Sequence, residues 1–478
     1  MKHLIFVLVA VWGIFQVAGL IGLSKGQFQA HSLAQLAEPP SHRLTEPYRN
    51  AYFYLLGFAA SASLDPARVG YETWVEAHET SDGNAFAYDK PGRSDLRIRL
   101  SPRQTLPSWD ADDPLGTFRS KDASLRTTVA GHQVLLARYD HCIGMPFEDW
   151  GFGHRATPRY EDSMVAHRLY IADGFSRSTN LGLERLYKEL VFWRTVLREA
   201  TTIETKVMAQ IVIQDDAKLL SRIVSRPIVD KSVLGAALQL MVPLTPSEYA
   251  LRWPIQHQLA VAGQDERART AHPRESAVGS DHEQEWLLAT AHLPPGSFRR
   301  IEHPISHSIL GFPLNSQQTA DMYATYYEAL IKASGAGAGP WPKLRQISGS
   351  MRRGFLESVV NQEPIEPEWE MFLYQLMETD ARLRLTSLQI QLRRPSPVTA
   401  VPTRLAEVGS QYFDPFTGLP MLWSPTQQKL YSVGKDRLDD GGDPSFDITV
   451  PAVIASSQKY SDSSPSAAAA STRKVSRL

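Results

Sequence analysis

The sequence predicts a mainly α-helical fold, with an N-terminal transmembrane helix, a multi-helix globular body and a small C-terminal β-hairpin module. Three observations predict it: an apolar run at residues 4–23, apolar residues at helical spacing through the middle of the chain, and short strand-like pieces near its end. The 478 residues accordingly divide into 1–24, a transmembrane signal anchor; 25–48, a linker; 49–395, the α-helical body; 405–450, the β-hairpin module; and 455–478, a disordered tail.

The N-terminal run from Leu4 to Leu23 contains no charged residue. A helix of this length rises about 30 Å, which is enough to cross the hydrocarbon core of a membrane. A cleaved signal peptide is the alternative, with small residues at 17–19, but the apolar run continues beyond them. We expect a retained single-pass anchor in a bacterial inner membrane, with most of the chain in the periplasm.

The first part of the body follows a proline-bearing linker. The aromatic stretch 48–58 predicts the apolar face of a packed helix, and a ligand platform is the alternative. Asp65 and Pro66 are a typical helix start, since Asp caps and Pro fits the first turn, and this helix is expected to reach about His78. Residues 80–125 are rich in Pro, Gly, Ser and Asp and predict loop.

The strongest helical pattern lies at residues 181–200. A second pattern runs on to Pro227, and the two predict a pair of long, antiparallel helices. Thr245 and Glu248 form a capping box around a helix start. Further helices are expected within 129–145, 163–174, 315–334 and 366–394. One face of the strongest helix is predicted to carry Leu183, Leu186, Tyr187, Leu190, Trp193 and Leu197.

Composition excludes several classes of function. A formal net charge of -1 and a pI near 6.9 give no electrostatic footprint for nucleic acid. Cys142 is the single cysteine, so the chain can form no internal disulfide and no thiolate cluster. We expect Cys142 to be a packed thiol rather than a nucleophile, because its neighbour His141 adjoins it in sequence rather than facing it.

Common catalytic motifs are missing from the sequence, including the phosphate-binding loop, the dinucleotide fingerprint and the HExxH zinc motif. GFSRS at 174–178 departs from a nucleophile elbow at its last residue and predicts a helix-ending turn. His282, His303 and His307 fall in stretches typical of solvated surface. Adjacent carboxylates such as 215–216 and 439–440 point apart on a helix or strand, which makes them poor acid–base pairs.

Residues 412–448 read YFDPFTGLPMLWSPTQQKLYSVGKDRLDDGGDPSFDI, with two short strand-like pieces followed by an acidic loop. The order of these residues resembles the C-terminal calcium-loop module of the type II secretion major pseudopilin. The resemblance implies that calcium binds here, through the Leu430 carbonyl, Ser432, Asp436 and Asp447. The alternative is a Gly/Asp turn without metal. The N-terminus of this chain lacks the prepilin pattern, and a pseudopilin has no counterpart of the helical body. The resemblance is therefore confined to this module.

Over most of its length, including NAYFYLLGF and ELVFWRTVL, the chain is similar to a group of membrane-anchored proteobacterial envelope proteins. That resemblance implies a location and brings no activity with it. We therefore expect a non-catalytic binding or scaffolding protein, attached to the inner membrane through residues 4–23, with an envelope protein as partner and no nucleic acid. The alternatives are a cell-envelope hydrolase and an accessory component of a secretion or pilus-like system.

Overall fold

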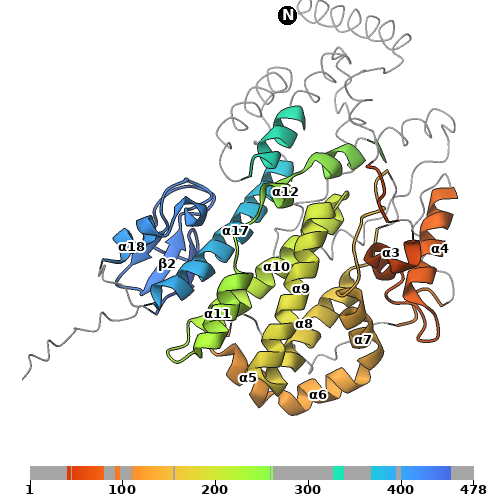
Figure 1. The fold of residues 1–478 in the computed structure, drawn as a ribbon, viewed down its shortest axis with the longest axis horizontal. Coiled ribbons are helices and arrows are strands. Elements are labelled where there is room, and N and C mark those ends of the chain that lie inside the picture. The colour runs from red at the N-terminus through yellow and green to blue at the C-terminus, as the bar shows by residue number, and fades with distance from the viewer. Residues whose placement is uncertain are drawn as a thin grey trace, which may run out of the picture.

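The computed structural model confirms a mainly helical chain with a small antiparallel sheet (Figure 1). It describes residues 40–44, 46–79, 92–96, 109, 111–153, 157–258, 260–261, 327–337, 368–394 and 400–453. The helices are η1 (Pro47–Arg49), α3 (Ala51–Leu56), α4 (Pro66–Glu79), α5 (Pro114–Ser120), α6 (Asp122–Gly131), α7 (Gln133–Cys142), α8 (Glu161–Arg177), α9 (Thr179–Glu199), α10 (Ile203–Val224), α11 (Lys231–Leu240), α12 (Pro246–Tyr249), α17 (Glu368–Leu392), α18 (Val401–Glu407) and η3 (Ser410–Tyr412).

Helices α8, α9, α10 and α17 form the core of the body. The predicted antiparallel pair is α9 and α10, joined by three residues and capped by Ser178 and Thr202, whose hydroxyls accept backbone N–H bonds at 3.1 and 3.3 Å. Helix α10 packs against α9 on one side and α17 on the other, so almost all of its residues are buried. This burial makes α10 the central helix of the bundle.

The predicted apolar face of α9 is correct except at one position. Leu186, Leu190 and Trp193 are at most 1% exposed, whereas Tyr187 is 56% exposed. The buried side of α9 also includes Phe192 and Val196, so it is centred away from Tyr187. The buried stripe instead passes through Glu189, which is 0% exposed.

The region 80–125, predicted to be loop, is helical in its described C-terminal part. Helix α5 begins after Asp113, whose carboxylate accepts the Gly116 N–H at 3.1 Å, and Pro114 occupies its first turn. Helix α6 follows almost directly. The prediction was wrong because it overlooked Asp113-Pro114 as a helix start. The same Asp-Pro pair at Asp65-Pro66 begins α4 as expected.

The C-terminal module contains one more strand than the predicted hairpin. Strands β1 (Leu422–Ser424), β2 (Lys429–Ser432) and β3 (Ile448–Pro451) form an antiparallel sheet in the order β1-β2-β3. The burial of β3 alternates along its four residues, but the strand follows the acidic loop, beyond the two strand-like pieces of the predicted hairpin. Its buried side chains pack the sheet against α17 (Figure 1).

The end of the predicted linker is attached to the body. Backbone N–H groups of Arg43 and Leu44 donate to the two carboxylate oxygens of Glu148 at 2.8 and 2.7 Å, and His42 stacks on Trp150 with ring centroids 4.0 Å apart. No helix among the described residues is long and apolar enough to span a membrane. The proposed anchor at 4–23 and the tail at 455–478 lie outside the described residues.

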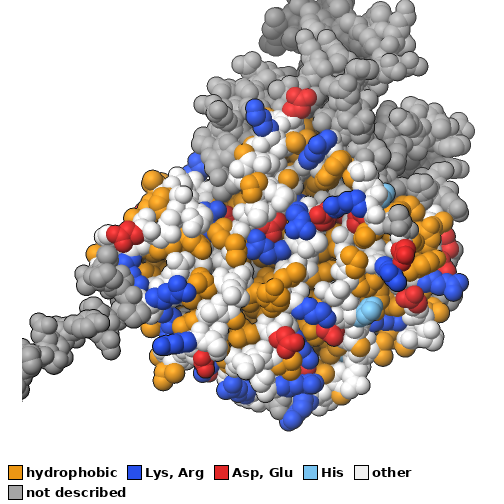
Figure 2. All heavy atoms as spheres, in the orientation of Figure 1, with side chains coloured by type: hydrophobic (Ala, Val, Ile, Leu, Met, Phe, Trp, Pro, Cys, Tyr) orange, Lys and Arg blue, Asp and Glu red, His pale blue; other side chains and the backbone are white. Residues whose placement is uncertain are grey.

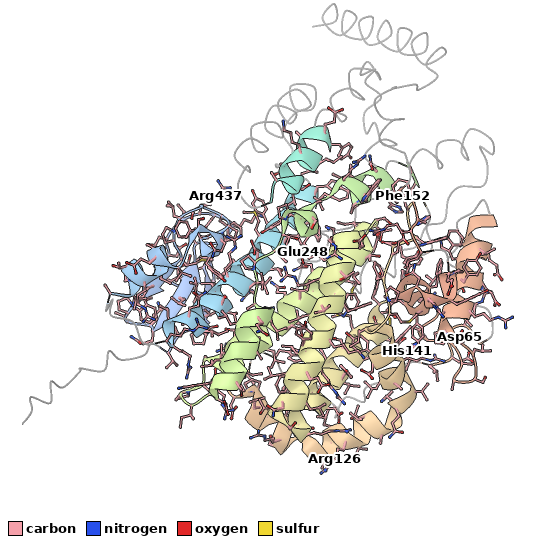
Figure 3. The ribbon with its side chains drawn as sticks, in the orientation of Figure 1. Asp65, Arg126, His141, Phe152, Glu248 and Arg437 are labelled. Atoms are coloured by element: carbon pink, nitrogen blue, oxygen red, sulfur yellow. The ribbon has the colours of Figure 1, made fainter. Side chains whose placement is uncertain are left out.

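Helices α3 and α4 touch backbone to backbone at two glycines. A Cβ added at Gly70 would lie 1.8 Å from the Phe53 carbonyl oxygen, whereas one added at Gly235 on α11 would meet nothing within 4 Å. Figure 3 draws the described side chains on the ribbon and labels Asp65, the residue that precedes α4.

We expect Gly70→Ala to lower the free energy of unfolding by about 2–4 kcal/mol, because the added methyl group forces the two helices apart. The matched change Gly235→Ala is expected to be neutral or to stabilise by up to about 1 kcal/mol, since Ala is the better helix former. Urea unfolding followed by circular dichroism measures both. Equal effects of the two changes would contradict the close approach of α3 and α4.

Candidate metal centre in the helical bundle

Three helices each place one polar side chain inside the bundle. His167 of α8, Glu189 of α9 and Asp216 of α10 are all 0% exposed. One ligand atom from each residue lies within 4.8 Å of those of the other two. Sites for metals in helical bundles are built in this way, from side chains on facing helices.

Glu189 connects the cluster. Its Oε1 atom lies 2.8 Å from His167 Nδ1 and also accepts a hydrogen bond from the Tyr139 hydroxyl. The indole N–H of Trp193 donates to the Tyr139 oxygen at 2.9 Å, and the Trp109 ring stacks on His167 with centroids 5.6 Å apart. The aromatic rings therefore fix the imidazole and one carboxylate oxygen in place.

Four polar atoms of the cluster have no hydrogen-bond partner among the described residues. They are His167 Nε2, Glu189 Oε2 and both carboxylate oxygens of Asp216. Burying a polar atom without a partner costs about 1–3 kcal/mol, and more for a charged group. Orphaned oxygens on two neighbouring carboxylates therefore indicate that the centre takes up something besides protein.

The charge of the cluster also indicates that it takes up a cation. Burial, then the nearby carboxylates of Glu189 and Asp215, raise the pKa of Asp216 well above its usual range. No cationic side chain contributes to this shift. Burial thus disfavours the charged form of Asp216, and a divalent cation would provide the positive charge that lets it ionise.

The donor set is one imidazole nitrogen with two carboxylates. Imidazole suits zinc and iron, and carboxylates suit manganese as well, so the set fits a first-row divalent ion. His167 Nδ1 and Glu189 Oε1 already share a hydrogen bond at 2.8 Å, so His167 Nε2, Glu189 Oε2 and the two Asp216 oxygens are the atoms left without a partner among the described residues.

The calcium ligands predicted for the C-terminal module lie around the β2–β3 end of the sheet. Ser432 and Asp447 are both buried, and they are close because Ser432 pairs with Ile448, the residue after Asp447. Asp436 is exposed. Leu430 lies within the central strand and pairs with Val450. The Ser432 hydroxyl accepts the Gly434 N–H at 3.3 Å, and the Asp436 carboxylate accepts the Leu438 N–H at 3.1 Å.

Asp447 has a buried carboxylate oxygen without a partner among the described residues. Its Oδ2 atom accepts the Gly442 N–H at 2.8 Å, whereas buried Oδ1 has no partner among the described residues. Burial raises the pKa of Asp447, and the carboxylates of Asp440, Asp439 and Asp436 raise it further, so these groups lie near one another. The structure thus gathers carboxylates at this loop.

Other predicted features have plain outcomes. Cys142 is buried at 0% exposure and burial raises the pKa of its thiol, as expected for a packed residue. Residues 51–56 are buried, which confirms a core role for that aromatic stretch. The chain at 174–178 ends α8 and begins α9, and 245–248 forms the capping box. His282, His303 and His307 lie outside the described residues.

Sequence reasoning missed the bundle cluster, although a signal for it exists. Glu189 follows Leu186 by three residues and precedes Trp193 by four, so it occupies a core position of an amphipathic helix. Asp216 likewise lies three residues after Ile213 and three before Leu219. A charged residue inside an apolar stripe is the pattern that could have found the site, whereas testing adjacent carboxylates as pairs could not.

Comparison with protein-family models, with curated protein sequences and with solved structures finds no match to this chain.

The raised pKa of Asp216 predicts a pH dependence of stability in the metal-free protein. Because its pKa is raised on folding, the folded chain binds one more proton than the unfolded chain at pH values between the two pKa values. Stability should therefore fall as pH rises above about 4, by up to about 1.4 kcal/mol per pH unit. In Asp216→Asn this loss should be absent. Calorimetric melting in EDTA from pH 5 to 8 measures it, and parallel curves for the two proteins would contradict the assignment.

Proposed function

We propose that the chain is a helical metal-binding scaffold protein, held together by one divalent ion at His167, Glu189 and Asp216. The observation that carries the proposal is the convergence of three fully buried ligand side chains whose remaining polar atoms have no partner among the described residues. The ion would join α8, α9 and α10, the three consecutive helices at the centre of the body.

Full burial favours an ion that holds the fold over one that meets a substrate. A catalytic metal keeps an open position for water and substrate, whereas a structural metal is enclosed. All three side chains are 0% exposed, and each is packed among apolar neighbours. This supports the non-catalytic function expected from the sequence over the alternative of an envelope hydrolase, which would need its converging Asp, Glu and His side chains in an accessible pocket.

We further propose that residues 4–23 attach this scaffold to a bacterial inner membrane, with the bundle in the periplasm and an envelope protein as its partner. The support is the length and apolar character of the N-terminal run. The surface seen in Figure 2 carries basic, acidic and apolar side chains interspersed over the bundle, as expected for a body exposed to water.

Metal analysis tests the proposal directly. Purified chain loaded with zinc or manganese and then dialysed should retain about one ion per molecule, and saturation to about 100 times Kd should stabilise it by about 2.7 kcal/mol. Asp216→Asn, Glu189→Gln and His167→Gln should lose both effects. Binding should also release a proton from Asp216, so affinity should increase with pH between 5 and 8.

The matched control is Asp215→Asn, next to the site in sequence. Asp215 faces away from the centre and pairs with Arg168 at 2.6 Å, so its loss should leave metal stoichiometry unchanged. Mass spectrometry for bound metal, together with thermal melting, gives both readouts. Full stoichiometry in Asp216→Asn, or no bound ion in the unaltered protein, would remove the metal centre.

A second ion is proposed at the C-terminal module, where calcium would use the Leu430 carbonyl, Ser432, Asp436 and Asp447. The observation that favours it is the buried, partnerless Oδ1 of Asp447 beside several carboxylates. Calcium takes six to eight oxygen ligands from carboxylates, carbonyls and water, and a turn can gather them.

Calcium titration of the full chain should raise the melting temperature, and Asp447→Asn should abolish the increase. Asp443→Asn is the control, because Asp443 is exposed and its carboxylate accepts the Ser445 N–H of its own turn at 2.9 Å. Scanning calorimetry at millimolar calcium with magnesium as the comparison ion separates a specific site from charge screening. An equal shift in both variants would reject the calcium site.

A further inference from the structure

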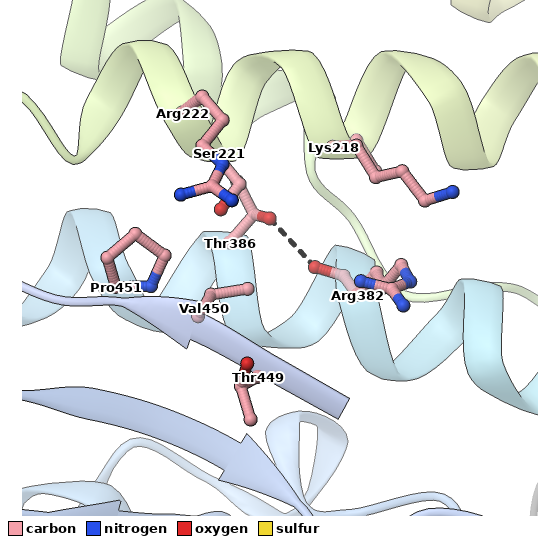
Figure 4. Close-up of a pocket in the computed structure, with 9 residues that line it drawn as sticks. Lys218, Ser221, Arg222, Arg382, Thr386, Thr449, Val450 and Pro451 are labelled. Atoms are coloured by element: carbon pink, nitrogen blue, oxygen red, sulfur yellow. Dashed lines mark hydrogen bonds between the residues drawn. The ribbon is translucent and has the colours of Figure 1, made fainter. Parts of the chain in front are cut away.

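A small basic groove lies where the bundle meets the C-terminal sheet (Figure 4). Its lining comes from three elements, α10, α17 and β3, and its cavity volume is about 50 Å³. The charged side chains that line it are all cationic: Lys218 and Arg222 from α10, and Arg382 from α17. A groove of this size with one sign of charge is suited to a single small anion.

Neighbouring carboxylates neutralise these cations only in part. Arg382 pairs with Glu378 of its own helix at 2.9 Å, and the Arg222 guanidinium lies 3.6 Å from fully exposed Asp112. Lys218 has no carboxylate within ion-pair distance among the described residues. Exposed or long ion pairs contribute little free energy, so the groove keeps positive charge available for a ligand.

Ser221 adds a hydroxyl to the lining of the groove from α10. The Thr386 hydroxyl on α17 is already engaged, because it donates to the Arg382 carbonyl at 2.8 Å (Figure 4). Strand β3 forms the third wall and is an edge strand of the sheet.

We propose that this groove binds a phosphate-type oxyanion, either free phosphate or the phosphate of a lipid headgroup. Guanidinium groups donate to phosphate oxygens in pairs, and the Lys218 ammonium adds a flexible point charge. The bound anion would connect α10 to the edge of the C-terminal sheet, so its binding would stabilise the junction between the bundle and the module. This site is separate from the proposed metal centre, because His167, Glu189 and Asp216 are buried inside the bundle and none of them lines the groove.

Thermal melting of the full chain, kept in mild detergent because of its apolar N-terminal run, tests the proposal. Inorganic phosphate at constant ionic strength should raise the melting temperature saturably, whereas chloride should not. The double variant Lys218→Gln/Arg222→Gln should weaken phosphate binding about tenfold or more, since each lost charge-assisted bond accounts for about that factor.

The matched control is Arg119→Gln/Lys121→Gln, which removes the same charge from exposed side chains at the end of α5. Short-chain phosphatidylglycerol, compared with short-chain phosphatidylcholine, distinguishes the sources. A saturable shift with inorganic phosphate identifies free phosphate as a ligand, and a shift with phosphatidylglycerol alone identifies a lipid headgroup. Either result supports the groove when it is lost in the Lys218 and Arg222 variant and kept in the control. No saturable shift, or one that survives in both variants, overturns it.

Discussion

The burial of α10 is the constraint on which the rest of the structure depends. Because α9 and α17 cover two sides of this helix, each of its polar side chains must find a partner inside the bundle. Lys206 donates to the Leu197 carbonyl at 2.6 Å, and burial lowers its pKa to about 7. Gln210 donates to the Thr379 hydroxyl at 2.8 Å, which ties α10 to α17. Both carboxylate oxygens of Asp216 are buried without such a partner among the described residues, and this observation is the basis of the proposed metal centre.

Arginine side chains donate hydrogen bonds to backbone carbonyl groups in turns and at helix ends, where the backbone has no regular partner. The Arg138 guanidinium donates to four backbone carbonyls in the turn after α3, between 2.7 and 3.1 Å. Arg393 donates to three backbone carbonyls at and after the end of α10, and Arg194 joins Glu248 to the carbonyls that precede α12. A fixed fork of five donors suits this task, and lysine could not replace it. These contacts set the positions of loops that carry no regular structure.

Local sequence signals predicted most of the helices, but they did not group His167, Glu189 and Asp216 as one site. Helix starts at Pro66 and Pro246 and the stripe through Leu186 and Trp193 depend on neighbours in sequence, so they could be predicted. The metal centre depends on how three helices are rotated about their axes, which a sequence fixes only through packing. For the same reason β3 was missed, because its four residues form a strand only when they pair with β2.

The clamp of Glu148 on the backbone of Arg43 and Leu44 has a consequence for how far the body can move. For a chain tethered through residues 4–23, as proposed, only the sixteen residues 24–39 lie between the tether and the first described residue of the body. Fully extended, they reach at most about 55 Å. The point where the linker joins the body would therefore stay within about this distance of the membrane surface. The linker would thus limit which envelope partners the bundle can reach.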